Sequence, residues 1–308
     1  MTTLLLTHPA CLEHDTGYGH PERPDRLRAV NKALAAPAFN ALARKKAPRA
    51  DLAAIERIHP KAYVEMVKSE IPEQNHNWLD PDTVVSSGSL EAALRATGAV
   101  LHAVDQVAEG KAKNAFCAIR PPGHHAEPSK AMGFCLFNSA AVAAMHARAA
   151  HGAKRVAVVD FDVHHGNGTQ AAFWEDKDAF YGSTHQMPLF PGTGALDETG
   201  VGNIFNAPLS PGDDGEKFRA AYAERVLPGL DAFAPELLIV SAGFDAHLMD
   251  PLAQIRVLEP DFAWVTEKLM DVAEKHCGGK LVSTLEGGYD LDALADSTAI
   301  HVKTLMGA

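Results

Sequence analysis

The sequence predicts an α/β protein in which a parallel sheet is covered by helices on both faces. Short apolar segments alternate along the chain with longer segments of helical periodicity. Polar residues that could carry chemistry follow four of the apolar segments, at the carboxyl ends where open α/β sheets bind ligands. With 308 residues, of which 46% are hydrophobic, the chain is long enough to bury a large core.

The strands are expected where apolar runs are short, and the helices where apolar residues recur with helical spacing. The expected strands are 2–7, 115–119, 156–160, 179–184, 237–241 and 281–285. The expected helices are 23–34, 62–69, 86–109, 138–151, 169–174, a segment from 215 to about 232, 260–276 and 291–306. The first helix is entered through a Pro-containing segment, and Gly110 ends the long one. The Gly- and Pro-rich segment 188–215 is expected to contain no element.

Composition limits the functions that the chain can have. Between residues 94 and 308 there is no linker, repeat or low-complexity tract, so we expect one domain over 1–308. The formal net charge of −11 argues against nucleic acid as a partner. Four scattered cysteines favour a reducing compartment and no cysteine-based zinc site. Without a secretory signal or a long apolar span, we expect a soluble, cytoplasmic protein with no membrane partner, and a homo-oligomer remains open.

The most informative segment is 160–168, with the sequence DFDVHHGNG, directly after the apolar run 155–159. In an extended strand, residues two apart project to the same side, which would place Asp160, Asp162 and His164 on one face. Carboxylates and an imidazole that converge are typical ligands of a divalent cation such as zinc. The alternative is a polar loop with a capping Asp and solvated histidines.

Three other strand ends carry unusual residues. They are the segments 120–125 (RPPGHH), 241–247 (SAGFDAH) and 286–289 (EGGY). His124 and His125 could be ordinary loop histidines, but the rigid Pro-Pro-Gly turn could also position a general base. Asp245 could form a turn, although the small residues before it favour a ligand role. Tyr289 alone would be a packed surface aromatic more often than a functional residue.

Six segments together resemble the zinc-dependent histone deacetylase family. They are 120–125, 133–138, 160–170, 190–194, 241–246 and 285–289, in the order the family has them. The resemblance runs from about His20 to the C-terminus and is greatest to the class II branch with its bacterial, acetoin-utilisation and acetylpolyamine-amidohydrolase relatives. It implies the arginase–deacetylase fold, a single domain with a central eight-stranded parallel sheet flanked by helices.

The resemblance implies one catalytic zinc ion, bound by Asp162, His164 and Asp245. Three protein ligands leave a coordination position for water and the substrate carbonyl. The family also implies one or two structural potassium ions. The residues expected at the inner potassium site are Ser183 and Thr184 with the backbone of Asp160, Asp162 and His164.

The family pattern also assigns roles to the residues around the metal. His125 is similar to the general base that later protonates the leaving amine, and His124 to its electrostatic partner. Asp160 resembles the carboxylate that orients His124. Asn167 lies where many relatives have an Asp beside the second histidine; the amide matches class II and should leave His125 less basic. Tyr289 is similar to the tyrosine that donates a hydrogen bond to the oxyanion.

A substrate tunnel and an inner channel are implied in the same way. Phe134 and Phe190 resemble the aromatic walls of the tunnel, Gly133 leaves room for the acyl-lysine stem, and Gly288 allows the tyrosine to move. Arg26 resembles the arginine of an acetate-release channel.

The expected reaction is zinc-dependent hydrolysis of an N-acyl amide, with acetyl as the leading candidate, to release acetate and a free amine. The substrate would be an acetyl-lysine protein or peptide, or an acetylated small amine such as a polyamine. At the rim, either Asp80 or Asp82 is a candidate to bind the substrate backbone. Two further alternatives are a two-manganese ureohydrolase and a catalytically silent module that binds acyl-lysine.

Overall fold

The computed structural model describes residues 2–307, so Met1 and Ala308, the ends of the expected domain, lie outside the described residues. The strands are β1 Thr3–Thr7, β2 Ala43–Lys46, β3 Asn77–Asp80, β4 Thr83–Val85, β5 Asn114–Cys117, β6 Val156–Asp160, β7 Ala179–Gln186, β8 Ile204–Leu209, β9 Leu237–Ala242 and β10 Leu281–Leu285. The α-helices are α1 Pro24–Ala33, α2 Leu52–Ile55, α3 Lys61–Ser69, α4 Ser89–Ala108, α5 Ser139–His151, α6 Asn167–Phe173, α7 Gly215–Ala221, α8 Leu227–Phe233, α9 Glu259–Cys277 and α10 Leu291–Leu305. Two short 3-10 helices, Pro9–Leu12 and Pro37–Phe39, and one π-helical segment, Tyr222–Val226, complete the description.

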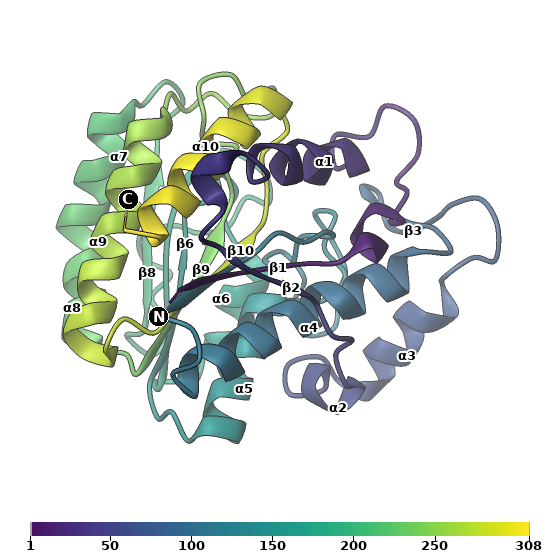
Figure 1. Cartoon of the computed structure of the whole chain (residues 1–308), viewed down its shortest axis with the longest axis horizontal. Coiled ribbons are helices and arrows are strands. Elements are labelled where there is room, and N and C mark those ends of the chain that lie inside the picture. Colours follow the sequence, from purple (N-terminus) through teal and green to yellow (C-terminus); the bar gives the residue numbers. More distant parts are fainter. Residues whose placement is uncertain (1, 308) are drawn as a thin grey trace.

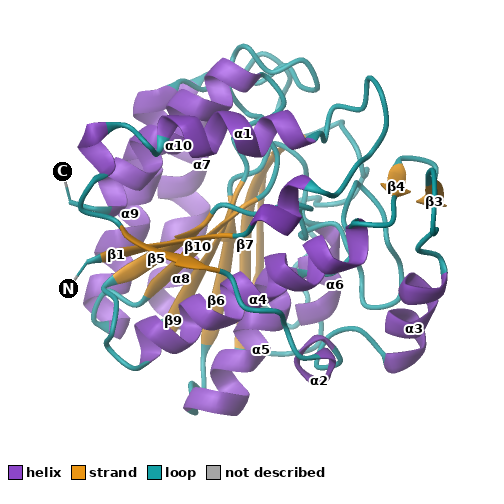
Figure 2. Cartoon of the chain, turned by 45° about the vertical axis from the view of Figure 1, so that its right-hand side comes forward, coloured by secondary structure: helices purple, strands orange, loops and turns teal. Residues whose placement is uncertain are grey.

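A parallel sheet of eight strands forms the centre of the molecule, in the order β2-β1-β5-β10-β9-β6-β7-β8. The helices α4, α5 and α6 pack on one face, and α1 and α7 to α10 on the other (Figures 1 and 2). The predicted fold class is therefore confirmed, including the strand number that the family resemblance implied. Separate from this sheet, β3 and β4 form a small antiparallel hairpin.

The central strands are apolar because both of their faces are covered. All residues of β6 (VAVVD), β9 (LLIVSA) and β10 (LVSTL) are buried. In a parallel sheet with helices on both sides, such continuous apolar runs replace the alternating pattern of a half-exposed strand. Asp160 and Ser241, at the carboxyl ends of β6 and β9, form side-chain hydrogen bonds, whereas the buried hydroxyl of Thr284 in β10 has no partner within the described residues.

Two strands at the sheet edges were not predicted. The first, β2, has the sequence ARKK and is mostly exposed, as expected of an edge strand protected by charge. At the other edge, β8 (IFNAPL) contains Pro208, which an edge strand accepts because one side of its backbone has no partner strand. The prediction that 188–215 contains no element was therefore wrong. The predicted helix from 215 to about 232 is also interrupted, by the π-helical segment.

Local sequence explains both ends of α5. The side chain of Asn138 accepts a hydrogen bond from the backbone of Ala141 and caps α5, and Gly152 ends this helix in the left-handed conformation at φ 68°. Among residues 2–307, no helix combines the length and apolar character required to cross a bilayer.

Candidate active site

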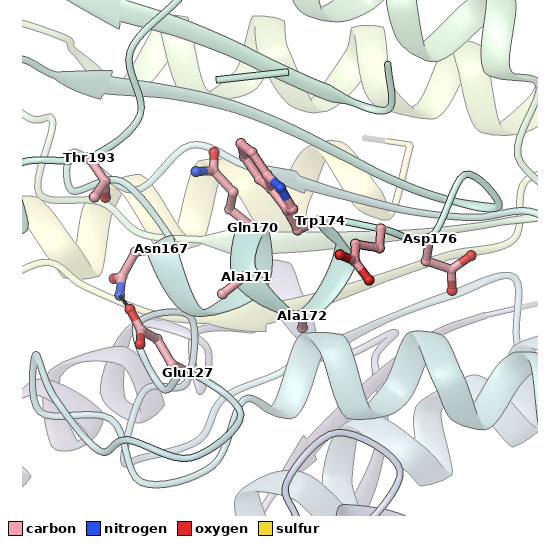
Figure 3. A pocket seen from close by; sticks show the side chains of 9 residues that line it. Glu127, Asn167, Gln170, Ala171, Ala172, Trp174, Asp176 and Thr193 are labelled. Atoms are coloured by element: carbon pink, nitrogen blue, oxygen red, sulfur yellow. Dashed lines mark hydrogen bonds between the residues drawn. The ribbon is translucent and has the colours of Figure 1, made fainter. Parts of the chain in front are cut away.

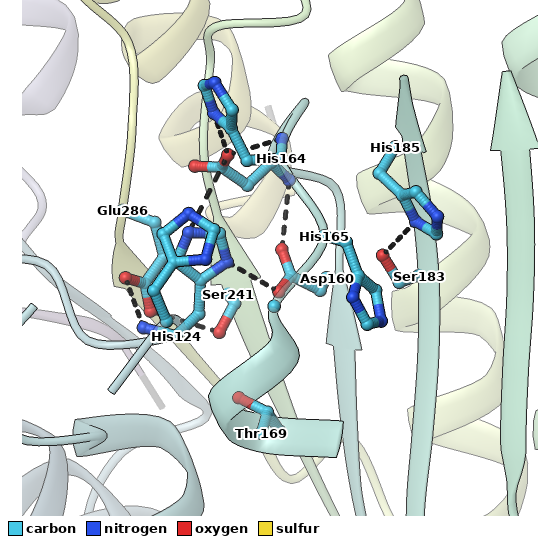
Figure 4. Close-up of polar contacts among 12 residues, drawn as sticks. His124, Asp160, His164, His165, Thr169, Ser183, His185, Ser241 and Glu286 are labelled. Atoms are coloured by element: carbon cyan, nitrogen blue, oxygen red, sulfur yellow. Dashed lines mark hydrogen bonds and ion pairs between the residues drawn. The ribbon is translucent and has the colours of Figure 1, made fainter. Parts of the chain in front are cut away.

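The predicted functional residues meet at the carboxyl ends of four neighbouring strands. In the sheet these strands lie in the order β5, β10, β9 and β6. Along the chain β6 directly follows β5, so two later strands lie between them in the sheet. The loops that follow the four strands carry His124 and His125, Tyr289, Asp245, and the pair Asp162 and His164. Figure 4 labels His124 and His164 of this group, with Asp160 beside them. A position where the strand order departs from the chain order is where open α/β sheets form their binding crevices.

Asp162, His164 and Asp245 form a buried group with the geometry of a metal site. Nδ1 of His164 lies 3.0 Å from Oδ2 of Asp245 and 3.2 Å from Oδ1 of Asp162. The three candidate ligand atoms lie within 4.8 Å of one another. Burial, together with the negative charge of Asp162, raises the pKa of Asp245. Two buried carboxylates beside an imidazole therefore need a positive charge between them, so this donor set fits a divalent cation such as Zn²⁺.

Backbone groups hold the two carboxylates in place. The amide of Gly287 donates to Oδ2 of Asp162 at 2.7 Å, and the amide of Val163 donates to Oδ1 of Asp245 at 2.8 Å. A Cβ atom at Gly243 would overlap Oδ2 of Asp162, and one at Gly287 would overlap the Asp245 carboxylate. These two glycines are therefore required for the close approach of the loops.

The structure separates Asp160 from the metal-ligating group. Because β6 ends at Asp160, the extended-strand argument that placed Asp160, Asp162 and His164 on one face was wrong. The Asp160 carboxylate instead accepts a hydrogen bond from Nδ1 of His124 at 2.9 Å and another from the amide of Asp162 at 3.1 Å. The chain then turns, and this turn, not strand pleating, brings Asp162 and His164 together.

The two neighbouring histidines have opposite electrostatic surroundings. Burial acts to lower the pKa of His124, but the carboxylates of Asp162 and Asp160 raise it to about 10. The pKa of His125 is instead well below its ordinary value, because of burial and then the positive charges of His124 and His164. Nδ1 of His125 donates to Oδ1 of Asn167 at 2.8 Å, which leaves Nε2 free. His124 is therefore suited to carry a charge and His125 to accept a proton.

An apolar pocket of about 250 Å³ leads to these groups. Its lining consists of Asp82, His125, Gly133, Phe134, His164, Leu189, Phe190, Leu252 and Tyr289. Gly133 has φ 58°, and a Cβ there would overlap the His125 ring. Phe190 is 40% exposed at the mouth, and the rings of Phe134 and Tyr289 lie 6.0 Å apart, edge to face. Of the two rim candidates, Asp82 lines this pocket and Asp80 does not.

Arg26 is buried next to the tyrosine loop and does not line the pocket. Its Nε donates to the Gly288 carbonyl and its Nη2 to the Glu286 carbonyl, both at 2.5 Å. The guanidinium carbon lies 4.8 Å from the centre of the Tyr289 ring. Arg26 therefore fixes the backbone at Gly288, whose φ is 118°, and supports the tyrosine. Its expected role in an acetate channel stays a prediction.

Two functional supports were not identified from the sequence. The Glu286 carboxylate accepts from the amides of Gly123 and His124, at 2.7 and 3.2 Å, and so fixes the tandem-histidine loop. Glu22 forms a buried ion pair with Arg26 at 3.0 Å and another with Arg120. A charged residue at the end of the apolar run 281–285 was a usable signal for Glu286. For Glu22, the i,i+4 spacing to Arg26 did not indicate a functional role, and its second partner, Arg120, lies 98 residues away.

The residues expected to bind potassium lie beside β6. Oγ of Ser183 is 2.9 Å from Nδ1 of His185, and the Tyr222 hydroxyl donates to the Asp160 carbonyl at 2.9 Å. Within the described residues, the buried hydroxyl of Thr184 has no hydrogen-bond partner. These contacts place the residues near one another, and the potassium site stays a prediction.

Comparison with known proteins agrees with this arrangement. Residues 20–305 match the family model of the histone deacetylase domain. The chain is 41% identical to histone deacetylase-like amidohydrolase of Pseudomonas aeruginosa over 88% of its own length and 73% of the relative's. It is 36% identical to the chloroplastic histone deacetylase 14 of Arabidopsis thaliana, over 99% of this chain and 77% of the relative.

Structural similarity is equally extensive. The crystal structure of the HDA15 HD domain superposes with a TM-score of 0.94 at 37% identity, and the match covers 99% of this chain and 88% of that one. The family match covers most of the chain, including all four loops that form the site. The chain therefore belongs to the histone deacetylase family of hydrolases.

Proposed function

We propose that this protein hydrolyses the acetyl amide of a lysine side chain, or of a similar alkylamine, with one zinc ion bound by Asp162, His164 and Asp245. The observation that carries the proposal is that His164, a member of this buried ligand group, lines an apolar pocket together with His125 and Tyr289. A (CH₂)₄ stem fits such a pocket, and its burial contributes about 0.8 kcal/mol per methylene.

Zinc bound by the three side chains would polarise the amide carbonyl and lower the pKa of water toward neutrality. His125 accepts the proton of the attacking water at Nε2 and returns it to the leaving amine. His124, whose Nδ1 is held by Asp160, keeps a positive charge next to the site. Tyr289 lines the pocket. Its hydroxyl group donates a hydrogen bond to the substrate carbonyl oxygen, which becomes negatively charged during the reaction.

The proposal also includes the enzyme class, the structural ions and the cellular location. Asn167 beside His125 supports a class II enzyme. One or two structural potassium ions are part of the proposal on the family resemblance alone. We further propose a single catalytic domain that acts in the cytoplasm. A two-manganese ureohydrolase is disfavoured. Within residues 2–307, the other group of three side chains that could hold a metal, Asp105, His146 and His151, is on α4 and α5 and not beside the proposed zinc ligands.

Replacement of Tyr289 by Phe is expected to lower kcat by about 10²–10³-fold, because one donor to the developing oxyanion is lost. Zinc content should be unchanged, since the tyrosine is not a ligand. Steady-state kinetics with an acetyl-lysine peptide and metal analysis measure both effects. Tyr18→Phe, which removes a hydroxyl from a fully exposed side chain, is the matched control. A Tyr289→Phe enzyme as fast as the parent would remove the proposed oxyanion role.

The substrate class is tested by kcat/KM measurements in parallel on acetyl-lysine peptides and acetylated polyamines. Acetylated small amines are the second candidate, because the family that the sequence resembles includes acetylpolyamine amidohydrolases. We expect the protein to release acetate from acetyl-lysine peptides, and we expect a hydroxamate chelator to inhibit this release. Turnover of polyamines alone would transfer the assignment to the second candidate, and no turnover of either class would contradict the proposal.

A further inference from the structure

We propose that Glu127 is a positioning residue that sets the tautomer of His125 through the side-chain amide of Asn167. The inference rests on the proposed function, because it concerns the nitrogen with which His125 accepts a proton. Glu127 lies two residues beyond His125 in the sequence, and its carboxylate reaches His125 only through Asn167.

The contacts form a chain of three side chains. Nδ1 of His125 donates to Oδ1 of Asn167 at 2.8 Å. Nδ2 of Asn167 donates to Oε1 of Glu127 at 2.8 Å, a contact that Figure 3 shows. Nδ2 also points at the sulfur of Met132, at 3.3 Å. Asn167 is 5% exposed, so its amide depends on these protein partners.

The orientation of the Asn167 amide decides which nitrogen of His125 carries the proton. An amide can present either its oxygen or its NH₂ group to a neighbour, and a neutral imidazole can adapt to either. With the oxygen toward His125, Nδ1 must be protonated, and Nε2 keeps the lone pair that a general base needs. With the NH₂ group toward His125, Nδ1 would be the acceptor and Nε2 would carry the proton, which is the wrong tautomer for a base.

Glu127 excludes the wrong orientation because a carboxylate only accepts hydrogen bonds. Turning the amide over would place Oδ1 of Asn167 against the Glu127 carboxylate and the Met132 sulfur, neither of which can donate to it. The carboxylate therefore requires Nδ2 on its side and Oδ1 on the side of His125. An Asp at position 167 would accept from His125 with either oxygen, so the requirement for Glu127 follows from the amide.

Glu127 is held in position and kept away from the substrate pocket. Its backbone pairs with that of Lys130 through two hydrogen bonds, of 3.0 and 3.3 Å. With Asn167, Gln170 and Thr193 it lines a separate, open pocket of about 730 Å³ (Figure 3). His125 lines the apolar pocket and not this one. Glu127 thus acts on the reaction only through Asn167, which makes it a positioning residue.

The direct test records the imidazole tautomer of His125 by long-range ¹H–¹⁵N NMR in the full-length, zinc-loaded protein without substrate. The parent is expected to show the Nδ1–H tautomer alone, and Glu127→Ala a mixture with the Nε2–H tautomer. Glu127→Gln brings an NH₂ group that can donate to the oxygen of an inverted Asn167 amide, so this variant should also show a mixture of tautomers. Glu175→Ala, which removes an exposed carboxylate from the same pocket, is the control. An unchanged tautomer in Glu127→Ala would overturn the proposal.

Kinetics in two backgrounds separate positioning from a general structural role. In the parent background, Glu127→Ala should lower kcat on the order of tenfold, a part of the 10²–10⁴-fold that acid–base catalysis contributes, with KM unchanged. In an Asn167→Asp background the same change should cost nothing, because the carboxylate at 167 needs no orientation. An equal loss in both backgrounds would contradict the proposal. The NMR experiment uses no substrate. Its result therefore tests the role of Glu127 even if the protein proves not to be a deacetylase.

Discussion

Asp162→Ala and Asp245→Ala are each expected to abolish zinc binding and turnover together. Either change leaves one carboxylate and His164, which are too few ligands to form a catalytic zinc site. Loss of the metal removes several kcal/mol of transition-state stabilisation, so kcat should fall by more than about 10³-fold. Metal analysis of the purified proteins and acetate release from an acetyl-lysine peptide measure the two effects.

A matched control separates loss of ligation from loss of charge. Asp197→Ala removes an exposed carboxylate outside the site and should keep both zinc and activity. Thermal unfolding of all variants shows whether they remain folded. A folded Asp162→Ala protein that turns over at the parental rate would contradict the ligand assignment, as would one that retains a full equivalent of zinc.

His125→Ala is expected to have the opposite combination of effects, with zinc retained and turnover lost. The side chain contacts Asn167 and lines the pocket but does not belong to the ligand group. Loss of a general acid–base group lowers the rate by about 10²–10⁴-fold. Metal content and kcat measured on the same preparation test this expectation.

His276→Ala is the control for this histidine substitution. His276 binds Asp231 at 2.7 Å near the end of α9, outside the site, and its removal should leave kcat unchanged. If His125→Ala lost its zinc, the residue would be part of the metal site instead. If its kcat remained parental, another group would have to be the base.

The sequence predicted the centre of the fold better than its edges. The strands β6, β9 and β10 are short apolar runs because helices cover both of their faces, and this burial is visible in composition. The edge strands β2 and β8 are polar or contain Pro, because one side of each has no partner strand. Their pairing depends on the neighbouring strand and not on their own periodicity.

The residues of the site were predicted more completely than their geometry. Position at the ends of buried strands made Asp162, His164 and Asp245 candidates, and the family resemblance selected them as the ligand set, which the structure brings together. The expected alignment with Asp160 was wrong, because the chain turns directly after β6. The roles of Glu286 and Glu127 depend on contacts between separate loops, which spacing along the sequence does not reveal.

The most direct test of the proposed function is titration of the metal-stripped protein with zinc while acetate release from an acetyl-lysine peptide is recorded. The site contains one group of three buried ligands, so activity should rise linearly and stop at one zinc per chain. A chain that binds one zinc and releases no acetate from any acetylated amine, or one that is fully active without metal, would contradict the account.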